Sequence, residues 1–228
     1  MSDLKEFQRL INYKFKNDEL LKQALTHSSF ANEKRMDRLM DNERLEFLGD
    51  AVLELVTSEF LYHKYREIPE GDLTKKRASI VCEQTLALCT KEIHLGEYLF
   101  LGKGEDLTGG RQRKSILSDA MEAIIGAIFL DGGLTNAKEF IQRFVLTDIE
   151  SKELFYDSKT ILQEFVQGNY EEELQYMVVD ELGPDHAKVF KVEARIGSQA
   201  VGMGEGPSKK AAEQEAAYHA LLMLKKKG

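Results

Sequence analysis

Hydrophobic residues recur every three or four positions through about the first 145 residues, a spacing typical of one face of an α-helix. This pattern predicts a series of amphipathic helices, at about 4–16, 18–25, 42–65, 73–92, 115–130 and 134–145. The polar stretch 32–41 is predicted to be a loop or a short helical turn, and the glycine-rich stretch 101–110 is predicted to be a loop. Because no segment here alternates as a strand does, this part of the chain is expected to be all-α.

The pattern changes after about residue 150. A helix is predicted at 157–167, and a strongly helical, alanine-rich segment closes the chain at 209–225. Between them, three segments have strand character: Leu174–Val179, Ala187–Ile196 and Ala200–Glu205. We therefore expect an all-α domain at 1–150 and a small α+β domain of order α-β-β-β-α at 151–228, with a short tether near 148–156.

Acidic side chains form a row within the stretch NERLEFLGD at 42–50. Glu43, Glu46 and Asp50 stand at i, i+3 and i+7, which places them on one face of a helix. Leu45 and Leu48 fall on a second face that can be buried. Like charges at this spacing repel by roughly 0.2–0.5 kcal/mol per pair, and no basic residue lies one turn from Glu46. The row therefore indicates a positive partner from outside the helix.

A second helix supplies two more acids without a basic neighbour one turn away, Asp119 and Glu122. This helix is apolar on nearly all sides, so it should be buried, and buried ionised carboxylates are very unfavourable without a partner. A shared divalent cation would satisfy both segments. Because oxygen-only ligands favour Mg²⁺, with Mn²⁺ able to substitute, Glu46, Asp50, Asp119 and Glu122 are the predicted metal ligands.

The composition suits a globular protein, with 43% hydrophobic and 31% charged residues. No apolar run reaches the length of a membrane span, and the first residues lack a signal-peptide core, so we expect no membrane association and a cytoplasmic location. Cys82 and Cys89 are expected to be reduced thiols. The net charge of −8 argues against a generally basic nucleic-acid binder, so any contact with nucleic acid must come from local patches.

One such patch is predicted in the second domain. Two lysines follow a serine at the start of the last helix, where the helix dipole and free N–H groups also favour phosphate. Two glutamines one turn apart and a histidine in a Gly-Pro turn can reach 2′-hydroxyls or base edges, which is how double-stranded RNA is read. The candidate RNA-binding residues are Gln163, Gln167, His186, Ser208, Lys209 and Lys210.

Other features of the first domain have two readings. Arg111, Arg113 and Lys114 lie just before the second acidic helix and could hold phosphates there, or could simply be solvated. His27 is expected to be a packed or capping histidine rather than a catalytic base. Neither feature carries a function by itself.

Several of these motifs together resemble the bacterial ribonuclease III family. The nuclease-domain motifs are NERLEFLGD at 42–50, LTHSS at 25–29 and SDAMEA at 118–123; GPDH at 183–186 and SKKAAEQEAA at 208–217 resemble the family's double-stranded RNA-binding domain. The resemblance covers nearly the whole chain. It implies an all-helical endonuclease domain that forms a homodimer, in which two active sites cut both strands of an RNA duplex.

The resemblance also implies residue roles. Glu46, Asp50, Asp119 and Glu122 match the metal-site positions, with Asp50 and Glu122 as catalytic residues and Glu122 closest to the chemistry. Glu43 and Glu70 match two further acids and are given supporting roles. The expected products carry 5′-phosphate and 3′-hydroxyl ends, and the expected substrates are ribosomal RNA precursors and structured messenger RNA.

The alternative is a catalytically inactive dimeric protein that binds double-stranded RNA. Such a protein would not need all four acids, and all four are present. A di-iron bundle is disfavoured because no histidine follows a glutamate by three residues. A nucleotide phosphohydrolase is disfavoured because the C-terminal domain is suited to a large substrate.

Overall fold

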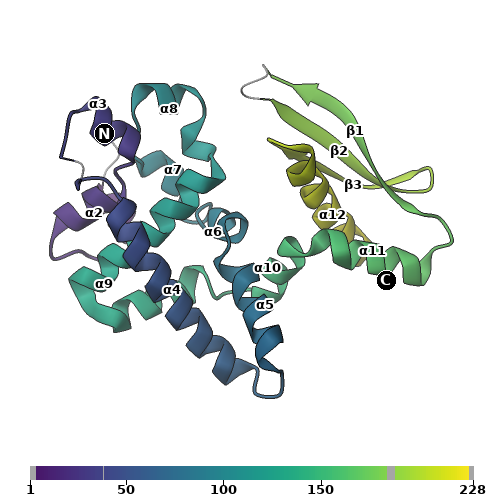
Figure 1. Ribbon diagram of the computed structural model, residues 1–228, viewed down its shortest axis with the longest axis horizontal. Coiled ribbons are helices and arrows are strands. Elements are labelled where there is room, and N and C mark those ends of the chain that lie inside the picture. The colour runs from purple at the N-terminus through teal and green to yellow at the C-terminus, as the bar shows by residue number, and fades with distance from the viewer. Residues whose placement is uncertain (1–3, 38, 184–187, 226–228) are drawn as a thin grey trace. The chain divides into compact units, whose positions relative to one another are not determined.

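The computed structural model describes residues 4–37, 39–183 and 188–225 (Figure 1). The chain forms two compact units, Met1–Ile149 and Glu150–Gly228. The first unit is helical and the second contains a helix, three antiparallel strands and a helix, which confirms the predicted fold classes. None of the helices in the described ranges combines the length and the apolar character that a membrane span requires.

The first unit is built from short helices arranged around two long ones (Figure 1). Its elements are α1 (Leu4–Leu10), α2 (Asp18–Ala24), α3 (Ser28–Glu33), α4 (Glu43–Lys64), α5 (Glu70–Val81), α6 (Glu83–Cys89), α7 (Leu95–Tyr98), α8 (Lys103–Leu107), the 3₁₀ turn η1 (Gly110–Gln112) and α9 (Lys114–Phe144). The apolar faces of α4 and α9 meet in the core, where Leu53, Met121 and Ile124 are fully buried. As the sequence predicts, α9 is really two helices, because Gly133 interrupts it with φ 79° and ψ 177°.

The prediction of one continuous helix at 73–92 is wrong. It is divided at Cys82, whose backbone is extended, into α5 and α6. The break is stabilised locally, because Thr85 Oγ1 donates to the carbonyl of Ser79 at 2.6 Å. A side chain therefore satisfies a carbonyl that a continuous helix would have paired with its own backbone.

A short helix forms in one predicted loop. The polar stretch 32–41 begins with the end of α3, whose N-cap is His27, and continues as a loop, in agreement with its prediction. The glycine-rich stretch 101–110 contains α8 and the start of η1. In the opposite sense, α1 stops at Leu10, well before the predicted residue 16, because Asn12 adopts a left-handed conformation with φ 52°.

The second unit is a sheet of order β1-β2-β3 with helices on one face (Figure 1). Its elements are α10 (Ile149–Tyr156, which begins at the last residue of the first unit), α11 (Ser158–Asn169), β1 (Leu174–Leu182), β2 (Val189–Ile196), β3 (Gln199–Gly206) and α12 (Lys209–Lys225). Val192, Ala194 and Ile196 alternate inward along β2 and pack against α12. The predicted tether is helical, and Leu154 of α10 is part of this core.

Glycines let β3 and α12 approach closely. A Cβ added to Gly202 would lie 2.2 Å from the carbonyl oxygen of Ala216, and one added to Gly204 would lie 2.3 Å from the Ala216 nitrogen. Small residues on both elements are therefore required. The alanine-rich composition of α12 reflects this packing as well as its helix propensity.

Candidate active site

The candidate site is set by the crossing of α4 and α9. A Cβ added to Gly49 of α4 would lie 1.8 Å from the carbonyl oxygen of Glu122, and one added to Gly126 of α9 would lie 2.2 Å from that of Leu45. The two backbones are thus in direct contact. In the sequence, a glycine near the acids on each helix is the signal that could have predicted this close approach.

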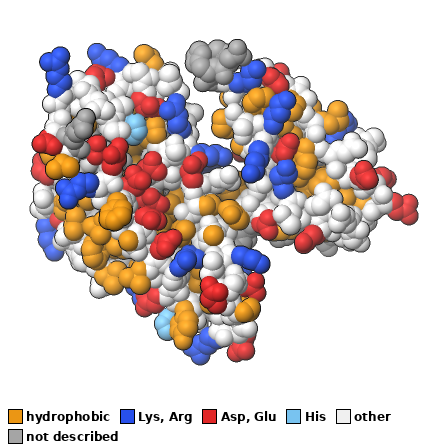
Figure 2. All heavy atoms as spheres, viewed as in Figure 1, with side chains coloured by type: hydrophobic (Ala, Val, Ile, Leu, Met, Phe, Trp, Pro, Cys, Tyr) orange, Lys and Arg blue, Asp and Glu red, His pale blue; other side chains and the backbone are white. Residues whose placement is uncertain are grey.

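This contact brings acids from both helices together. One carboxylate oxygen from each of Glu46, Asp119 and Glu122 lies within 4.8 Å of the others, and all three side chains are partly buried. We call these three residues the acidic cluster. Figure 2 shows acidic side chains gathered over this part of the unit.

Burial and mutual repulsion favour protonation of the acidic cluster. Burial raises the pKa of Glu122 to about 8, and the charges of Asp50 and Glu46 add to this shift. Burial, followed by the charge of Asp119, raises the pKa of Glu46. Burial also raises the pKa of Asp119, although a hydrogen bond from Ser118 (3.3 Å) opposes the shift. Among the described residues, no lysine or arginine offsets these charges.

The other two acids of the row lie at the edge of the cluster. Asp50 is exposed, and its carboxylate is not one of the three that converge, yet its charge acts on both Glu46 and Glu122. Glu43 is also exposed and raises the pKa of Glu46. The structure therefore brings three of the four predicted ligands within range of one ion and leaves Asp50 alongside.

Glu70 lies away from the cluster within this chain. It begins α5, accepts a hydrogen bond from Thr74 Oγ1 at 2.8 Å, and lines a cavity with Ser58 and Tyr62 near the end of α4. Ser58 is twelve residues beyond Glu46 on the same helix, which corresponds to about 18 Å along its axis.

The arginines before α9 are held by the protein itself. Arg111 forms two hydrogen bonds with Asp106, at 2.7 and 3.1 Å, and also binds backbone carbonyls. Arg113 pairs with Glu105. Each guanidinium therefore helps to fix the segment of α8 and η1. Because 36% of the Arg111 side chain and 45% of the Arg113 side chain stay exposed, phosphate contact and solvation both stay predictions.

The predicted RNA-binding residues occupy exposed positions in the second unit. Gln163 and Gln167 project from α11, and Lys209 and Lys210 begin α12. Ser208 caps α12, because its Oγ accepts from the nitrogen of Ala211 at 3.2 Å. His186 lies outside the described residues.

Lys209 has local partners. It lies 3.8 Å from a carboxylate oxygen of Glu181 and 5.6 Å from the ring centre of Phe190. These contacts orient the side chain while leaving more than half of its surface exposed. Figure 2 shows Lys and Arg side chains on the visible face of this unit.

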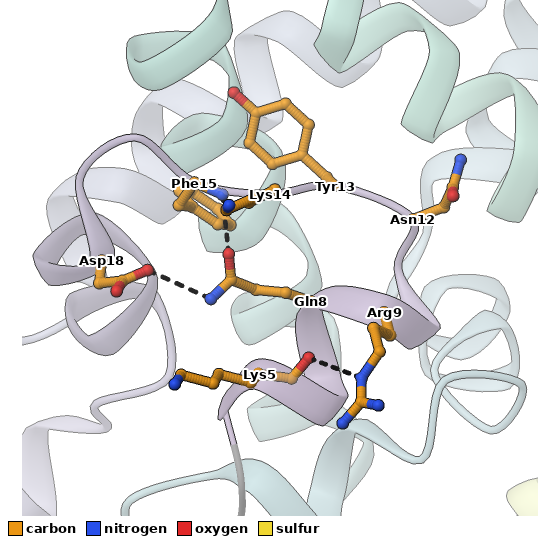
Figure 3. Close-up of a pocket in the computed structure, with 8 residues that line it drawn as sticks. All are labelled: Lys5, Gln8, Arg9, Asn12, Tyr13, Lys14, Phe15 and Asp18. Atoms are coloured by element: carbon orange, nitrogen blue, oxygen red, sulfur yellow. Dashed lines mark hydrogen bonds between the residues drawn. The ribbon is translucent and has the colours of Figure 1, made fainter.

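A cavity of about 820 Å³ lies at the N-terminus, apart from the acidic cluster (Figure 3). Gln8 is one of its lining residues and links two others, because its side chain donates to Asp18 at 3.1 Å and accepts from the nitrogen of Phe15 at 2.8 Å. Lys5 and Arg9 line it as well. None of its lining residues is one of the predicted site residues.

Comparison with known families agrees with the two units. Residues 17–149 match the family described as Ribonuclease-III-like, and residues 158–224 match the double-stranded RNA binding motif. The chain belongs to the ribonuclease III family. It is an endoribonuclease with a double-stranded-RNA-binding domain, and the family is one of metal-dependent nucleases, consistent with the acidic cluster.

Similar proteins span almost the whole chain. Ribonuclease 3 of Bacillus velezensis is 47% identical over 228 residues, covering 99% of this chain and 92% of that protein. Ribonuclease 3 of Listeria monocytogenes is 44% identical over 226 residues, covering 98% of this chain and 99% of that protein. The nuclease domain of ribonuclease III from Campylobacter jejuni has a similar structure, with a TM-score of 0.59 and 43% identity, covering 63% of this chain and 96% of that one. In that nuclease domain, the region involved in dimer formation shows structural flexibility.

Proposed function

We propose that the acidic cluster binds Mg²⁺ and is the site where this endoribonuclease hydrolyses phosphodiester bonds of double-stranded RNA. The observation that carries the proposal is the convergence of Glu46, Asp119 and Glu122 with no lysine or arginine among the described residues to neutralise them. A divalent cation would relieve both the repulsion and the desolvation that raise their pKa values. Because all three ligands are carboxylates, the site suits Mg²⁺, and Mn²⁺ should substitute.

The roles of the acids follow from their positions. Glu46, Asp119 and Glu122 would hold the cation between α4 and α9, while the exposed Asp50 is free to contact solvent and substrate at the mouth of the site. When bound, the cation supplies Lewis-acid chemistry, polarising the phosphate and lowering the pKa of a water. We assign Asp50 and Glu122 to catalysis, with supporting roles for Glu43 and Glu70. The products would have 5′-phosphate and 3′-hydroxyl ends.

We assign nuclease and dimerisation roles to residues 1–150 and RNA binding to 151–228. The binding edge would combine Gln163 and Gln167 with the start of α12, where Lys209 and Lys210 meet the positive end of the helix dipole. Minor-groove contacts from one element and phosphate contacts from the other would recognise the shape of duplex RNA. His186 is proposed to belong to the same edge.

A homodimer is supported by the exposed face of α4. Phe47 is 80% exposed and Leu55, two turns further, is 58% exposed, an unusual amount of apolar surface beside an acidic site. Substituting Phe47 by Asp should dissociate the dimer, as measured by sedimentation. Leu107→Asp is the control, since Leu107 is 88% exposed on α8 rather than on α4 and its substitution should leave the dimer intact. Dissociation by both variants, or by neither, would contradict this assignment of the interface.

The expected substrates are ribosomal RNA precursors and structured messenger RNA. We propose that the protein acts in the cytoplasm, where these transcripts are made. The bacterial relatives named Ribonuclease 3 support this setting.

The decisive experiment compares Glu122→Gln with Glu139→Gln, an exposed carboxylate on the part of α9 that follows Gly133. In Mg²⁺, Glu122→Gln should cut duplex RNA very slowly while binding it within a few-fold of wild type. Glu139→Gln should behave as wild type in both assays. Normal cutting by Glu122→Gln would rule out the proposed site, and loss of cutting in both variants would show that the effect is not specific to the cluster.

A further inference from the structure

His27 is held in one orientation by hydrogen bonds. Its Nδ1 accepts from the backbone nitrogen of Ser29 at 3.2 Å and lies 2.8 Å from Ser29 Oγ. That Oγ accepts from the nitrogen of Gly102 at 2.9 Å, so its own hydrogen is directed to the imidazole. Because Nδ1 then receives two donors, this pattern assigns the ring hydrogen to Nε2.

The backbone around His27 is equally fixed. The nitrogen of His27 donates to the carbonyl of Phe100 at 3.1 Å, and the nitrogen of Phe100 donates to Leu25 at 2.8 Å. The carbonyl of Thr26 accepts from the nitrogen of Asn42 at 2.9 Å, and Asn42 is the N-cap of α4. The imidazole is therefore anchored next to the first turn of the helix that carries Glu46.

His27 also lies within electrostatic range of Asp119 on α9, close enough that a positive charge on its ring lowers the pKa of that acid. Within the described residues, Nε2 has no hydrogen-bond partner, and the side chain is partly exposed. A rigid N–H donor therefore lies near the carboxyl groups of the acidic cluster.

We propose that Nε2–H of His27 donates a hydrogen bond to a nonbridging phosphate oxygen of the RNA strand at the acidic cluster and so orients the phosphodiester to be cut. This inference rests on the proposed function of the cluster. A phosphate approaching three carboxylates needs donors as well as a cation. An imidazole N–H can donate from this position, whereas the fixed positive charge of a lysine would compete with the cation for Asp119.

Two substitutions separate this role from helix capping. His27→Asn keeps a short side-chain acceptor for the nitrogen of Ser29, because asparagine is a good N-cap, but it removes the distant donor. His27→Gln places an amide N–H near the original Nε2 and gives up the short acceptor. The Asn variant should therefore be the more stable of the two, and the Gln variant should cleave RNA faster.

The test measures single-turnover cleavage of a duplex RNA in Mg²⁺ and the thermal unfolding of each full-length variant. Loss of one donor to a reacting phosphate should slow His27→Asn by about 100–1,000-fold while leaving its unfolding near wild type. His27→Gln should cut faster than His27→Asn although it is less stable. A phosphorothioate at the sensitive nonbridging oxygen should slow wild type more than His27→Asn, a difference that a structural role would not produce.

The proposal is overturned if His27→Asn cuts at the wild-type rate, or if cleavage in the two variants simply follows their stability. Glu122→Gln is assayed in parallel to keep the two hypotheses apart. If Glu122→Gln is inactive and His27→Asn is fully active, only the role of His27 fails. If Glu122→Gln is fully active, the proposed function itself fails.

Discussion

Replacing Glu122 by Gln should make the metal-free protein more stable at neutral and alkaline pH, although it removes a functional group. The pKa of Glu122 is raised from 4.5 to about 8 in the folded protein. The folded state therefore retains this proton over a pH range in which the unfolded state has lost it. It follows that the stability of wild type falls as the pH rises from 4.5 towards 8 and then levels off.

The size of the effect follows from the shift. One pKa unit corresponds to about 1.4 kcal/mol, so at pH 7 the unfavourable contribution of Glu122 has an upper limit of about 3 kcal/mol. Because the side chain is only partly buried, solvent screening reduces this to about 1–2 kcal/mol. Glutamine has nearly the same shape and no charge, so the variant should gain this amount.

The assay is hydrogen exchange of α4 and α9 peptides in EDTA at pH 5, 7 and 9, corrected for the intrinsic pH dependence of exchange. The stability difference between Glu122→Gln and wild type should be near zero at pH 5 and should grow with pH. Added Mg²⁺ should then protect wild type much more than the variant. A variant no more stable than wild type at pH 9, or a difference that does not increase with pH, would refute this account of the cluster.

Further predictions concern the backbone contact between α4 and α9, the hydrogen bonds of Asp131 and the RNA-binding edge. Gly49→Ala should destabilise the first unit by more than about 2 kcal/mol and abolish its protection by Mg²⁺. The control Gly71→Ala should do neither, because its Cβ would meet nothing within 4 Å. Equal destabilisation by the two variants in denaturant unfolding would contradict the prediction. Asp131→Asn should cost about 1–3 kcal/mol, since this carboxylate accepts from one hydroxyl and two backbone N–H groups. Although burial opposes it, these bonds lower the Asp131 pKa, so wild type should lose this stabilisation as the pH falls below about 4 and the variant should show no such loss in acid titration. Lys209→Ala with Lys210→Ala should weaken duplex binding and flatten its dependence on salt, because fewer counterions are released; an unchanged slope would place both lysines outside the interface.

Periodicity and apolar composition predicted the long elements well because each of these elements places many apolar side chains in a core. The acidic helix, the second acidic helix and the α-β-β-β-α order are all observed close to their predicted bounds. The break at Cys82 was missed because the apolar spacing continues across it, and the break depends on side-chain bonds such as that from Thr85 to the carbonyl of Ser79. Short helices such as α8 are set by tertiary contacts, which local composition does not report.

For the site, the sequence predicted which acids lie on which helix face, but not how closely the helices approach. The crossing decides that Glu46, Asp119 and Glu122 converge and that Asp50 lies beside them. Likewise, the charge of Arg113 was compatible with phosphate contact or with solvation, and the sequence did not indicate its ion pair with Glu105. Partners that are distant in sequence decide whether a charged group is available.

The contact of Gly49 with α9 fixes how far apart the ligand-bearing helices can be. The distances between the acids are set by the contact between the two backbones, so they do not depend on the packing of neighbouring side chains. The core around the crossing can accept changes in volume during evolution while the spacing of the ligands stays constant. A methyl group at this one position would test that spacing more directly than any substitution of the acids themselves.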